Sequence, residues 1–169
     1  NIKKYEKEIG FKLSSGQQFI EYSPLSIKYL KFISNLIKNK GGGLLVIDYG
    51  YTDKKMKDTL KSISKHKFSN ILESFAKSDI SYDINFSFLE TILKKFGLRV
   101  NKITNQKNFL VEMGIMERAE IISKNLLFSQ KANIFFRLKK LIDDNQMGKI
   151  FKVMFASNKN IIFKTGFKS

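Results

Sequence analysis

GGGLLVIDYG, residues 41–50, is the stretch that decides the fold class of this 169-residue chain. Its glycines can end a helix, because glycine adopts the backbone conformations that helix ends require. The four apolar residues that follow form a short continuous run, which is typical of a central parallel strand buried on both faces. Upstream, Ser23 and Pro24 form a strong helix start, and apolar residues recur at helical spacing as far as Ile37. A helix, a glycine turn and a buried strand together predict an α/β unit.

A second unit of the same kind follows. Asn85 can cap a helix that Gly97 ends, and residues 99–104 then have the pattern of a strand. The same patterns predict later helices over residues 106–113, 116–128 and 133–142, and later strands over residues 149–156 and 161–167.

The remaining segments carry weaker patterns. Ile9, Phe11 and Leu13 alternate with polar neighbours, which predicts a half-buried strand with a return strand over residues 17–21. Residues 51–82 are polar and rich in Lys, so we interpret them as a long connection with one short helix near residues 70–76. Connections of this length within a domain are usually functional or mobile.

The composition excludes several kinds of site. The chain has no cysteine and a single histidine, so it can form neither a disulfide, nor a thiolate metal site, nor a two-histidine metal site. No apolar run approaches the roughly 18 residues of a membrane span. Lys and Arg outnumber Asp and Glu by 31 to 15, giving a net charge of +16. Most of these cations are scattered Lys without a recognition helix, which indicates a solvated surface and disfavours nucleic acid as a partner.

Six short segments, in order, match the pattern of one enzyme family. Each segment alone is weak, but their order over residues 20–156 makes the set specific. They are Glu21-Tyr22-Ser23-Pro24; Gly42-Gly43 through Ile47-Asp48-Tyr49-Gly50; Thr59-Leu60 with His66; Asp79-Ile80-Ser81 with Ile84-Asn85-Phe86; Gln106 with Phe109-Leu110, Gly114-Ile115 and Arg118; and Met147-Gly148 with Phe151-Lys152-Val153. In these segments the chain resembles the MidA-type methyltransferases that use S-adenosyl-L-methionine (SAM), the family that includes the mitochondrial complex I assembly protein arginine methyltransferase.

The resemblance implies an α/β fold, namely the C-terminal part of a Rossmann-like SAM-dependent methyltransferase fold with helical insertions. Residues 1–169 would be the C-terminal portion of one domain, and the cofactor-binding N-terminal half would lie outside this chain. The family's glycine-rich cofactor loop follows a strand, whereas residues 41–43 precede one and cannot replace it. The residues that contact SAM therefore stay unknown. Asn85 stands where the family has Asp, and it can still cap a helix.

Three residues are candidates for catalysis. Asp48 follows a predicted central strand, at the sheet edge where α/β proteins bind ligands, and its carboxylate could hold a guanidinium. Tyr49 could pack on the face of that group. His66 has an ordinary pKa near neutrality and could accept a proton. The structural alternatives are that Asp48 caps a turn, that Tyr49 belongs to the core, and that His66 is a solvated loop residue.

Four further residues are candidates for substrate binding. Gly50 would let the backbone turn away from the site. Asp79 and Ser81 place oxygens on a loop that could hold a cationic substrate, although such residues also form ordinary turns. Gln106 could shape the mouth of the substrate pocket, and at a helix start it could equally be structural.

The resemblance implies a SAM-dependent methyltransferase that acts on protein arginine. The protein substrate would be a complex I subunit in mitochondria, the enzyme a possible homodimer, and its location the bacterial cytoplasm or, in a eukaryote, the mitochondrial matrix. Two other hypotheses stay open. One is a non-catalytic remnant of a truncated or split gene, and the other is a basic nucleic-acid-binding module.

Overall fold

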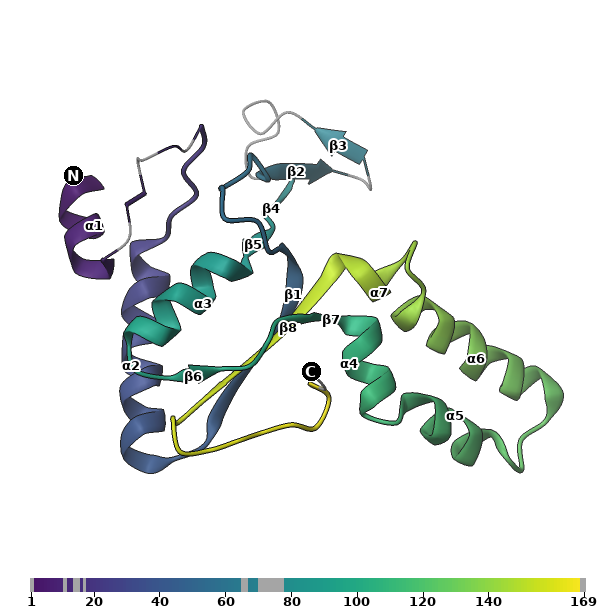
Figure 1. The fold of residues 1–169 in the computed structure, drawn as a ribbon. Coiled ribbons are helices and arrows are strands. Elements are labelled where there is room, and N and C mark those ends of the chain that lie inside the picture. The colour runs from purple at the N-terminus through teal and green to yellow at the C-terminus, as the bar shows by residue number, and fades with distance from the viewer. Residues whose placement is uncertain are drawn as a thin grey trace.

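The computed structural model describes residues 2–10, 12–13, 16, 18–64, 67–69 and 78–167. Its centre is a mixed sheet in the order β5-β1-β8-β6, with β7 also paired to β8 (Figure 1). The sheet strands are β1 (Gly43–Tyr51), β5 (Ile84–Asn85), β6 (Arg99–Val100), β7 (Thr104–Asn105) and β8 (Phe151–Ser157). The helices are α1 (Ile2–Ile9), α2 (Pro24–Lys40), α3 (Phe86–Lys95), α4 (Gln106–Glu112), α5 (Ile115–Ser123), α6 (Phe128–Ile142) and α7 (Met147–Ile150).

The predicted start and end of α2 are confirmed. The Ser23 hydroxyl accepts a hydrogen bond from the backbone N–H of Ser26 at 3.2 Å, which satisfies one of the donors left open at a helix start. Gly41 and Gly42 follow the helix with φ values of 83° and 91°, where a side chain would be strained. This turn reverses the chain direction and leads it into β1.

The helix α3 also begins as predicted. The Asn85 side chain accepts a hydrogen bond from the N–H of Phe88 at 3.0 Å. Asn therefore caps this helix at the position where the family that the chain resembles has Asp. Helices α2 and α3 bury one face of the sheet, and the fully buried residues include Phe86 and Leu93 of α3 and Met154 of β8.

The prediction that β1 is a parallel strand buried on both faces is wrong. Residues 43–49 pair antiparallel with β8, and only Gly50 and Tyr51 pair in parallel, with β5. On the opposite side of residues 43–49, no strand of the described ranges pairs with β1. On the face away from α2 and α3, Leu45 is 46% exposed and Ile47 40% exposed. An apolar run indicates burial but does not state what covers each face.

The predicted N-terminal strand pair is also wrong. Ile9 ends α1, and Gln18 to Glu21 form no strand; Phe11 lies outside the described residues. Ile9 and Leu13 are four residues apart and both fully buried, and they pack against Ile27 of α2. Alternation over so few residues does not separate the period of a strand from the four-residue spacing of a helix.

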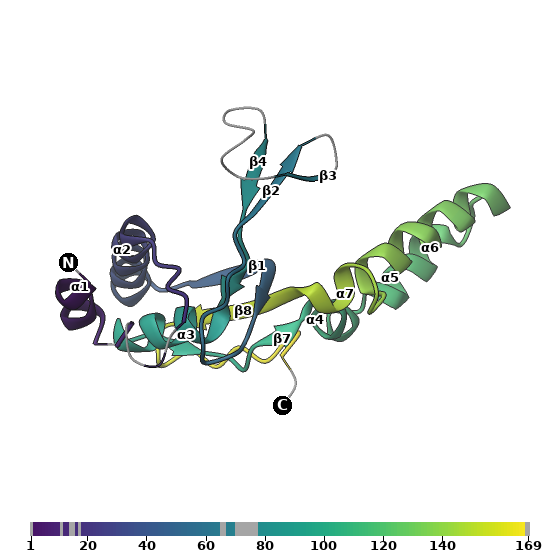
Figure 2. The ribbon, with the colours of Figure 1, turned by 90° about the horizontal axis from the view of Figure 1, so that it is seen from above.

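The Lys-rich residues 51–82 contain a second sheet where a long connection was expected. It has the order β3-β2-β4, from β2 (Lys61–Ser64), β3 (Lys67–Ser69) and β4 (Asp79–Ser81), and projects from the main sheet (Figure 2). Its strands are only three or four residues long, too short to show periodicity. The helix predicted near residues 70–76 falls outside the described residues.

The C-terminal half follows the predicted order with shorter strands. The segment 99–104 forms two short strands, β6 and β7. After α6, the chain reaches β8 through the short helix α7. Residues 161–167 do not form the predicted strand. They cross the sheet as an irregular segment, and Phe163 and Phe167 pack on Phe155 of β8 with ring centroids 4.6 and 6.3 Å away. Their alternation reflects contact with a sheet face.

Gly50 offers a direct test of this packing. A Cβ added there would meet the Ile84 carbonyl and lie 2.6 Å from the Phe86 ring, both of which are fixed in the core. Gly50→Ala should therefore destabilise the fold by about 1–3 kcal/mol, as overpacking does. Urea unfolding measures this. Gly43→Ala is the control in the same strand, because there the nearest atoms belong to the Phe155 ring and the nearest backbone atom, the Ala156 carbonyl oxygen, is 3.0 Å away, farther than the Ile84 carbonyl is from a Cβ at Gly50. Equal losses would contradict the argument.

Candidate functional site

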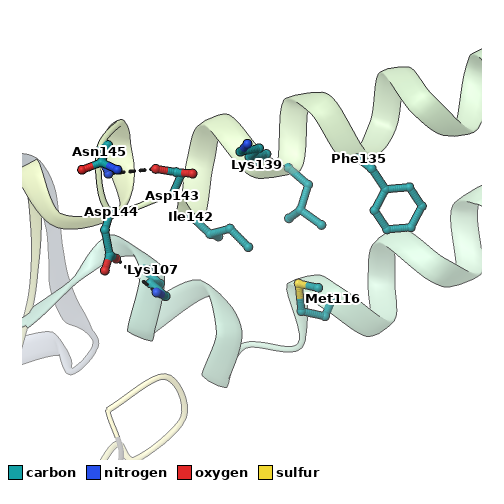
Figure 3. A pocket seen from close by; sticks show the side chains of 9 residues that line it. Lys107, Met116, Phe135, Lys139, Ile142, Asp143, Asp144 and Asn145 are labelled. Atoms are coloured by element: carbon teal, nitrogen blue, oxygen red, sulfur yellow. Dashed lines mark hydrogen bonds and ion pairs between the residues drawn. The ribbon is translucent and has the colours of Figure 1, made fainter.

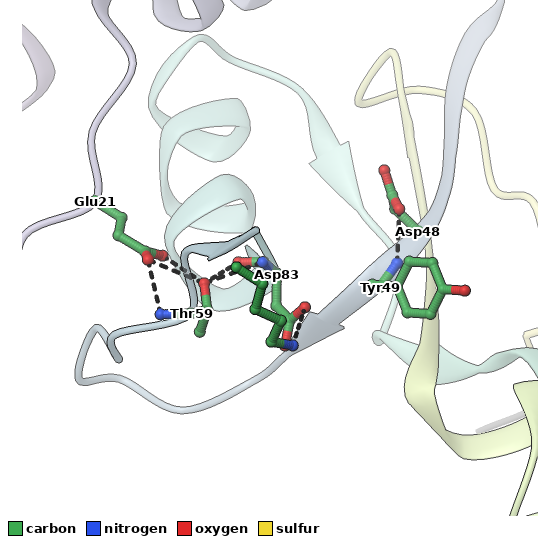
Figure 4. A network of polar contacts seen from close by, with 6 residues as sticks. Glu21, Asp48, Tyr49, Thr59 and Asp83 are labelled. Atoms are coloured by element: carbon green, nitrogen blue, oxygen red, sulfur yellow. Dashed lines mark hydrogen bonds and ion pairs between the residues drawn. The ribbon is translucent and has the colours of Figure 1, made fainter. Parts of the chain in front are cut away.

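The candidate site lies at the carboxyl end of β1, where Asp48 and Tyr49 are found (Figure 4). The Asp48 carboxylate accepts the N–H of Tyr49 at 2.7 Å. The Tyr49 ring packs on Phe151, its cross-strand partner, with centroids 4.1 Å apart. Successive side chains of a strand point to opposite faces. The structure therefore does not bring Asp48 and Tyr49 into one pocket, although both lie at this end of the sheet.

Gly50 lies within β1 and does not make a sharp turn. Its φ is not positive, and what requires glycine is the close approach of Ile84 and Phe86. Its place in the fold accounts for the residue type without any substrate contact.

Lys152 is the cross-strand partner of Asp48 in the antiparallel register. Partners of this kind point to the same face. The Lys152 amine, however, donates to the carbonyl of Lys149, and burial lowers its pKa. Within the described part of the chain, no cation lies within salt-bridge distance of Asp48.

A network around Thr59 lies beside this end of β1 (Figure 4). The Thr59 hydroxyl donates to the Glu21 carboxylate at 2.8 Å and accepts from the N–H of Asp83 at 3.0 Å, and the Thr59 N–H also donates to Glu21 at 2.9 Å. The Asp83 carboxylate pairs with Lys61 at 3.0 Å. Thr59 thus ties together the segment before α2, the loop before β2 and the loop before β5.

This network was not predicted as part of the site. Glu21 and Thr59 belong to the segments that carry the family resemblance, but a sequence does not show which oxygen meets which N–H across 38 residues. The sequence signal that could have linked these two residues is that both belong to segments that match the family pattern. Thr59 is only 7% exposed, and a buried Thr in a polar loop is itself an indication of a specific hydrogen bond.

An apolar groove opens next to the network. Its volume is about 350 Å³, and it runs between α2, β1 and α3. Ile33, Leu44 and Leu89 contribute to its walls, while Glu21 and Asp83 lie at its polar end. A groove that combines apolar walls with a few polar groups is the usual form of a ligand site.

The other predicted site residues lie elsewhere. Asp79 and Ser81 are exposed at the two ends of β4, in the projecting sheet. Gln106 is 7% exposed, and its amide donates to the Leu141 carbonyl at 2.9 Å, which joins α4 to the end of α6. His66 lies outside the described residues. The structure therefore gathers Asp48, Tyr49 and Gly50 at one edge and gives Gln106 a structural contact.

A second groove, of about 510 Å³, lies between α4, α5 and α6 (Figure 3). Its floor is apolar and includes Met116, Phe135 and Ile142. At one end, the Asp144 carboxylate pairs with Lys149 at 2.8 Å and with Lys107 at 3.1 Å. No group of three metal-binding side chains occurs among the residues that the structure describes.

Thr59 should be necessary for the network because it satisfies both Glu21 and the Asp83 N–H. Thr59→Val removes the hydroxyl, leaves the Asp83 N–H unpaired and leaves Glu21 with only the backbone N–H of residue 59, so the free energy of unfolding should fall by about 1–3 kcal/mol. Thr59→Ser keeps the hydroxyl and should lose much less. Urea denaturation of both variants measures the difference, and a loss of equal size would show that the methyl group, rather than the hydroxyl, stabilises this region.

The two salt bridges of Asp144 predict a lowered pKa for its carboxyl group. The Lys149 hydrogen bond first, and then that of Lys107, lowers the pKa of the Asp144 carboxyl below its ordinary value. An NMR titration of the Asp144 carboxyl should therefore give a midpoint below the ordinary pKa of an aspartate. Lys149→Gln should raise the midpoint, and by more than Lys107→Gln does. No change in either variant would mean that the two pairs do not persist in solution.

Comparisons with known proteins agree with this fold. One solved structure, an uncharacterised protein from Burkholderia thailandensis, superposes with a TM-score of 0.73 at 20% identity, over 93% of this chain and 42% of that one. A second protein from the same organism, solved with S-adenosyl-homocysteine bound, gives a TM-score of 0.63 at 22% identity, over 85% of this chain and 36% of that one. The chain therefore has the α/β architecture of these proteins.

The family follows from the sequence comparison. Residues 1–104, more than half of the chain, match the family model described as "Putative S-adenosyl-L-methionine-dependent methyltransferase". The chain belongs to this family. Curated relatives include the mitochondrial protein arginine methyltransferase NDUFAF7 of Danio rerio, 28% identical over 75% of this chain, and that of Homo sapiens, 27% identical over 78%. The chain spans only 29% and 30% of the lengths of these two relatives.

Proposed function

We propose that this chain is the C-terminal, substrate-side portion of a SAM-dependent methyltransferase. The observation that carries the proposal is the open edge of β1 at residues 43–49, together with the bare apolar face at Leu45 and Ile47. An unpaired edge exposes backbone N–H and C=O groups, and a neighbouring strand would pair with them. A cofactor-binding N-terminal half would supply that strand and cover that face.

The described residues do not by themselves form a SAM cradle. Such a cradle needs a glycine-rich turn that leaves a strand and opens a helix. In this chain Gly41 and Gly42 follow α2 and lead into β1, and β1 ends at Tyr51, where Thr52 and Asp53 follow it. The main SAM contacts are therefore assigned to the other half. When bound, SAM supplies an electrophilic methyl group.

The residues of this chain would orient the substrate nitrogen. Of the four carboxylates near the end of β1, Glu21 is engaged by Thr59, Asp83 by Lys61 and Asp53 by Lys57. Asp48 is the one that could receive a guanidinium through charge-assisted hydrogen bonds. Methylation of that nitrogen requires loss of a proton, and His66 is the residue we assign to accept it.

The finer points rest on the relatives. The names of the NDUFAF7 proteins describe mitochondrial protein arginine methyltransferases, which supports a protein arginine substrate. A complex I subunit as that substrate, a homodimer, and a location in the mitochondrial matrix or bacterial cytoplasm belong to the same proposal. No helix in the described ranges is long and apolar enough to cross a membrane.

Calorimetry with SAM tests the division into halves. The chain alone should not bind SAM, and the chain joined to the residues encoded upstream should bind it, because the longer protein would contain the glycine-rich turn. Binding by neither would favour a non-catalytic remnant instead.

Asp48→Asn in the longer protein tests the substrate site. Loss of a charged hydrogen-bond acceptor should reduce methyl transfer to an arginine-containing protein by about tenfold to a hundredfold. SAM affinity should stay unchanged. Asp58→Asn, an exposed residue of the nearby loop, is the matched control. Unchanged transfer in Asp48→Asn would remove Asp48 from the site.

A further inference from the structure

Two adjoining pockets lie beside β6 and β7, where the C-terminal segment 158–167 passes (Figure 1). One has a volume of about 450 Å³ and the other of about 310 Å³, and Lys102 and Phe167 line both of them. The C-terminal segment is held in place here, since the Asn101 side chain donates to the Phe163 carbonyl at 2.6 Å. We call the two pockets together the basic pocket.

The basic pocket is lined by cations and by no carboxylate of the described residues. Its cations are Arg99, Lys102, Lys152 and Lys164. None of the four forms a salt bridge with a residue that the structure describes. Three other grooves each have a carboxylate in their walls: Asp144 between α4, α5 and α6, Glu21 between α2 and α3, and Glu112 in a groove along α4 that adjoins the basic pocket.

The fold brings together here two acid-free parts of the sequence, residues 91–111 and residues 145–167. Each contributes two of the four cations. Residues 22–47 are also acid-free, but the exposed Lys28 and Lys31 of α2 line none of these five pockets. What distinguishes the basic pocket is the convergence of cations in one concave place, where their fields add and concentrate counter-ions.

Lys152 connects the basic pocket to the end of β1. It lines the smaller pocket together with Thr52, which directly follows β1, and it is the cross-strand partner of Asp48. Its ammonium group donates to the Lys149 carbonyl and has two further donors. Burial lowers the pKa of Lys152, because the charged amine has lost part of its water. A bound anion would offset that loss.

We propose that the basic pocket binds carboxylate side chains of the protein substrate, close in sequence to the arginine that Asp48 receives. This inference rests on the proposed function. An extended chain advances about 3.3 Å per residue and cross-strand partners lie about 5 Å apart, so a carboxylate about one to three positions from the arginine reaches the pocket. The enzyme therefore prefers arginines that are flanked by Asp or Glu.

A polyanion such as a nucleic acid suits this surface less well. Asp48 lies opposite Lys152, so it repels a run of phosphates that passes this end of β1. A peptide with one arginine and one carboxylate meets a charge of the opposite sign at each position. Complementary charges of this kind determine specificity more than affinity, so the effect should appear in the choice of substrate.

Fluorescence anisotropy with the chain alone tests the pocket without SAM or methyl transfer. A labelled peptide of Gly and Ser that contains three Glu should bind, and more weakly as salt rises. The same peptide with Gln in place of Glu should not bind. Lys102→Gln with Lys164→Gln should weaken the binding about fourfold to twentyfold, because each exposed ion pair contributes a factor of about two to five.

Lys28→Gln with Lys31→Gln is the matched control, because it removes the same charge from exposed positions of α2. It should leave binding unchanged, and circular dichroism should show both double variants folded. Equal weakening by this control, no binding of the Glu peptide, equal binding of the Gln peptide, or equally tight binding of an oligonucleotide of the same charge would each overturn the proposal.

Methyl transfer by the chain joined to its upstream residues tests the preference itself. A peptide whose single arginine is flanked by Glu should have a kcat/KM about fivefold above that of its Gln counterpart. The difference should lie in KM, because the pocket binds substrate and takes no part in the chemistry. Equal kcat/KM values, or a preference that survives Lys102→Gln with Lys164→Gln, would contradict the proposal. If the longer protein does not bind SAM, the proposed function fails while the anisotropy result still decides whether the pocket binds carboxylates.

Discussion

The antiparallel ladder between β1 and β8 is the interaction on which the rest of the structure depends. It joins residues 43–49 to residues 151–157, so it closes the fold across most of the chain. Its register places Tyr49 on Phe151 and Asp48 opposite Lys152. Every element between these strands must therefore leave the sheet and return to it. The projecting sheet leaves from the end of β1, and after α6 the chain returns to the start of β8 through α7.

What the sequence predicts well is local. The caps at Ser23 and Asn85 were predictable because a capping side chain bonds an N–H only three residues away. The glycine turn before β1 was predictable because the positive φ that ends a helix is a local property that favours glycine. The pairing of β1 was not, since a parallel and an antiparallel neighbour both accept the same apolar run. Gln106 shows the limit clearly, because its partner is a carbonyl 35 residues further along the chain.

For the candidate site, too, the sequence predicted local features but not the contacts between distant residues. The sequence predicted that Asp48 lies at the carboxyl end of an apolar strand, and the structure places it at that end of β1. The acidic groups around it, Glu21 and Asp83, could not be distinguished from it by the sequence, because a sequence does not show which partner each carboxylate meets. Thr59 and Lys61 engage the first two, and that contact information exists only in the fold. The family resemblance named the segments without stating which of their residues meet.

The charges near a site decide what it attracts more than the net charge of the chain does. A chain of net charge +16 should repel a cationic substrate if all its charges acted together. At physiological salt, however, screening limits the reach of exposed charges to about 8 Å. A substrate at the end of β1 would therefore respond mainly to the charges nearby, which include Asp48 and its cross-strand partner Lys152. The net charge of the chain therefore does not by itself exclude a cationic ligand at this edge, because nearby groups act on a ligand more strongly than distant, screened ones do.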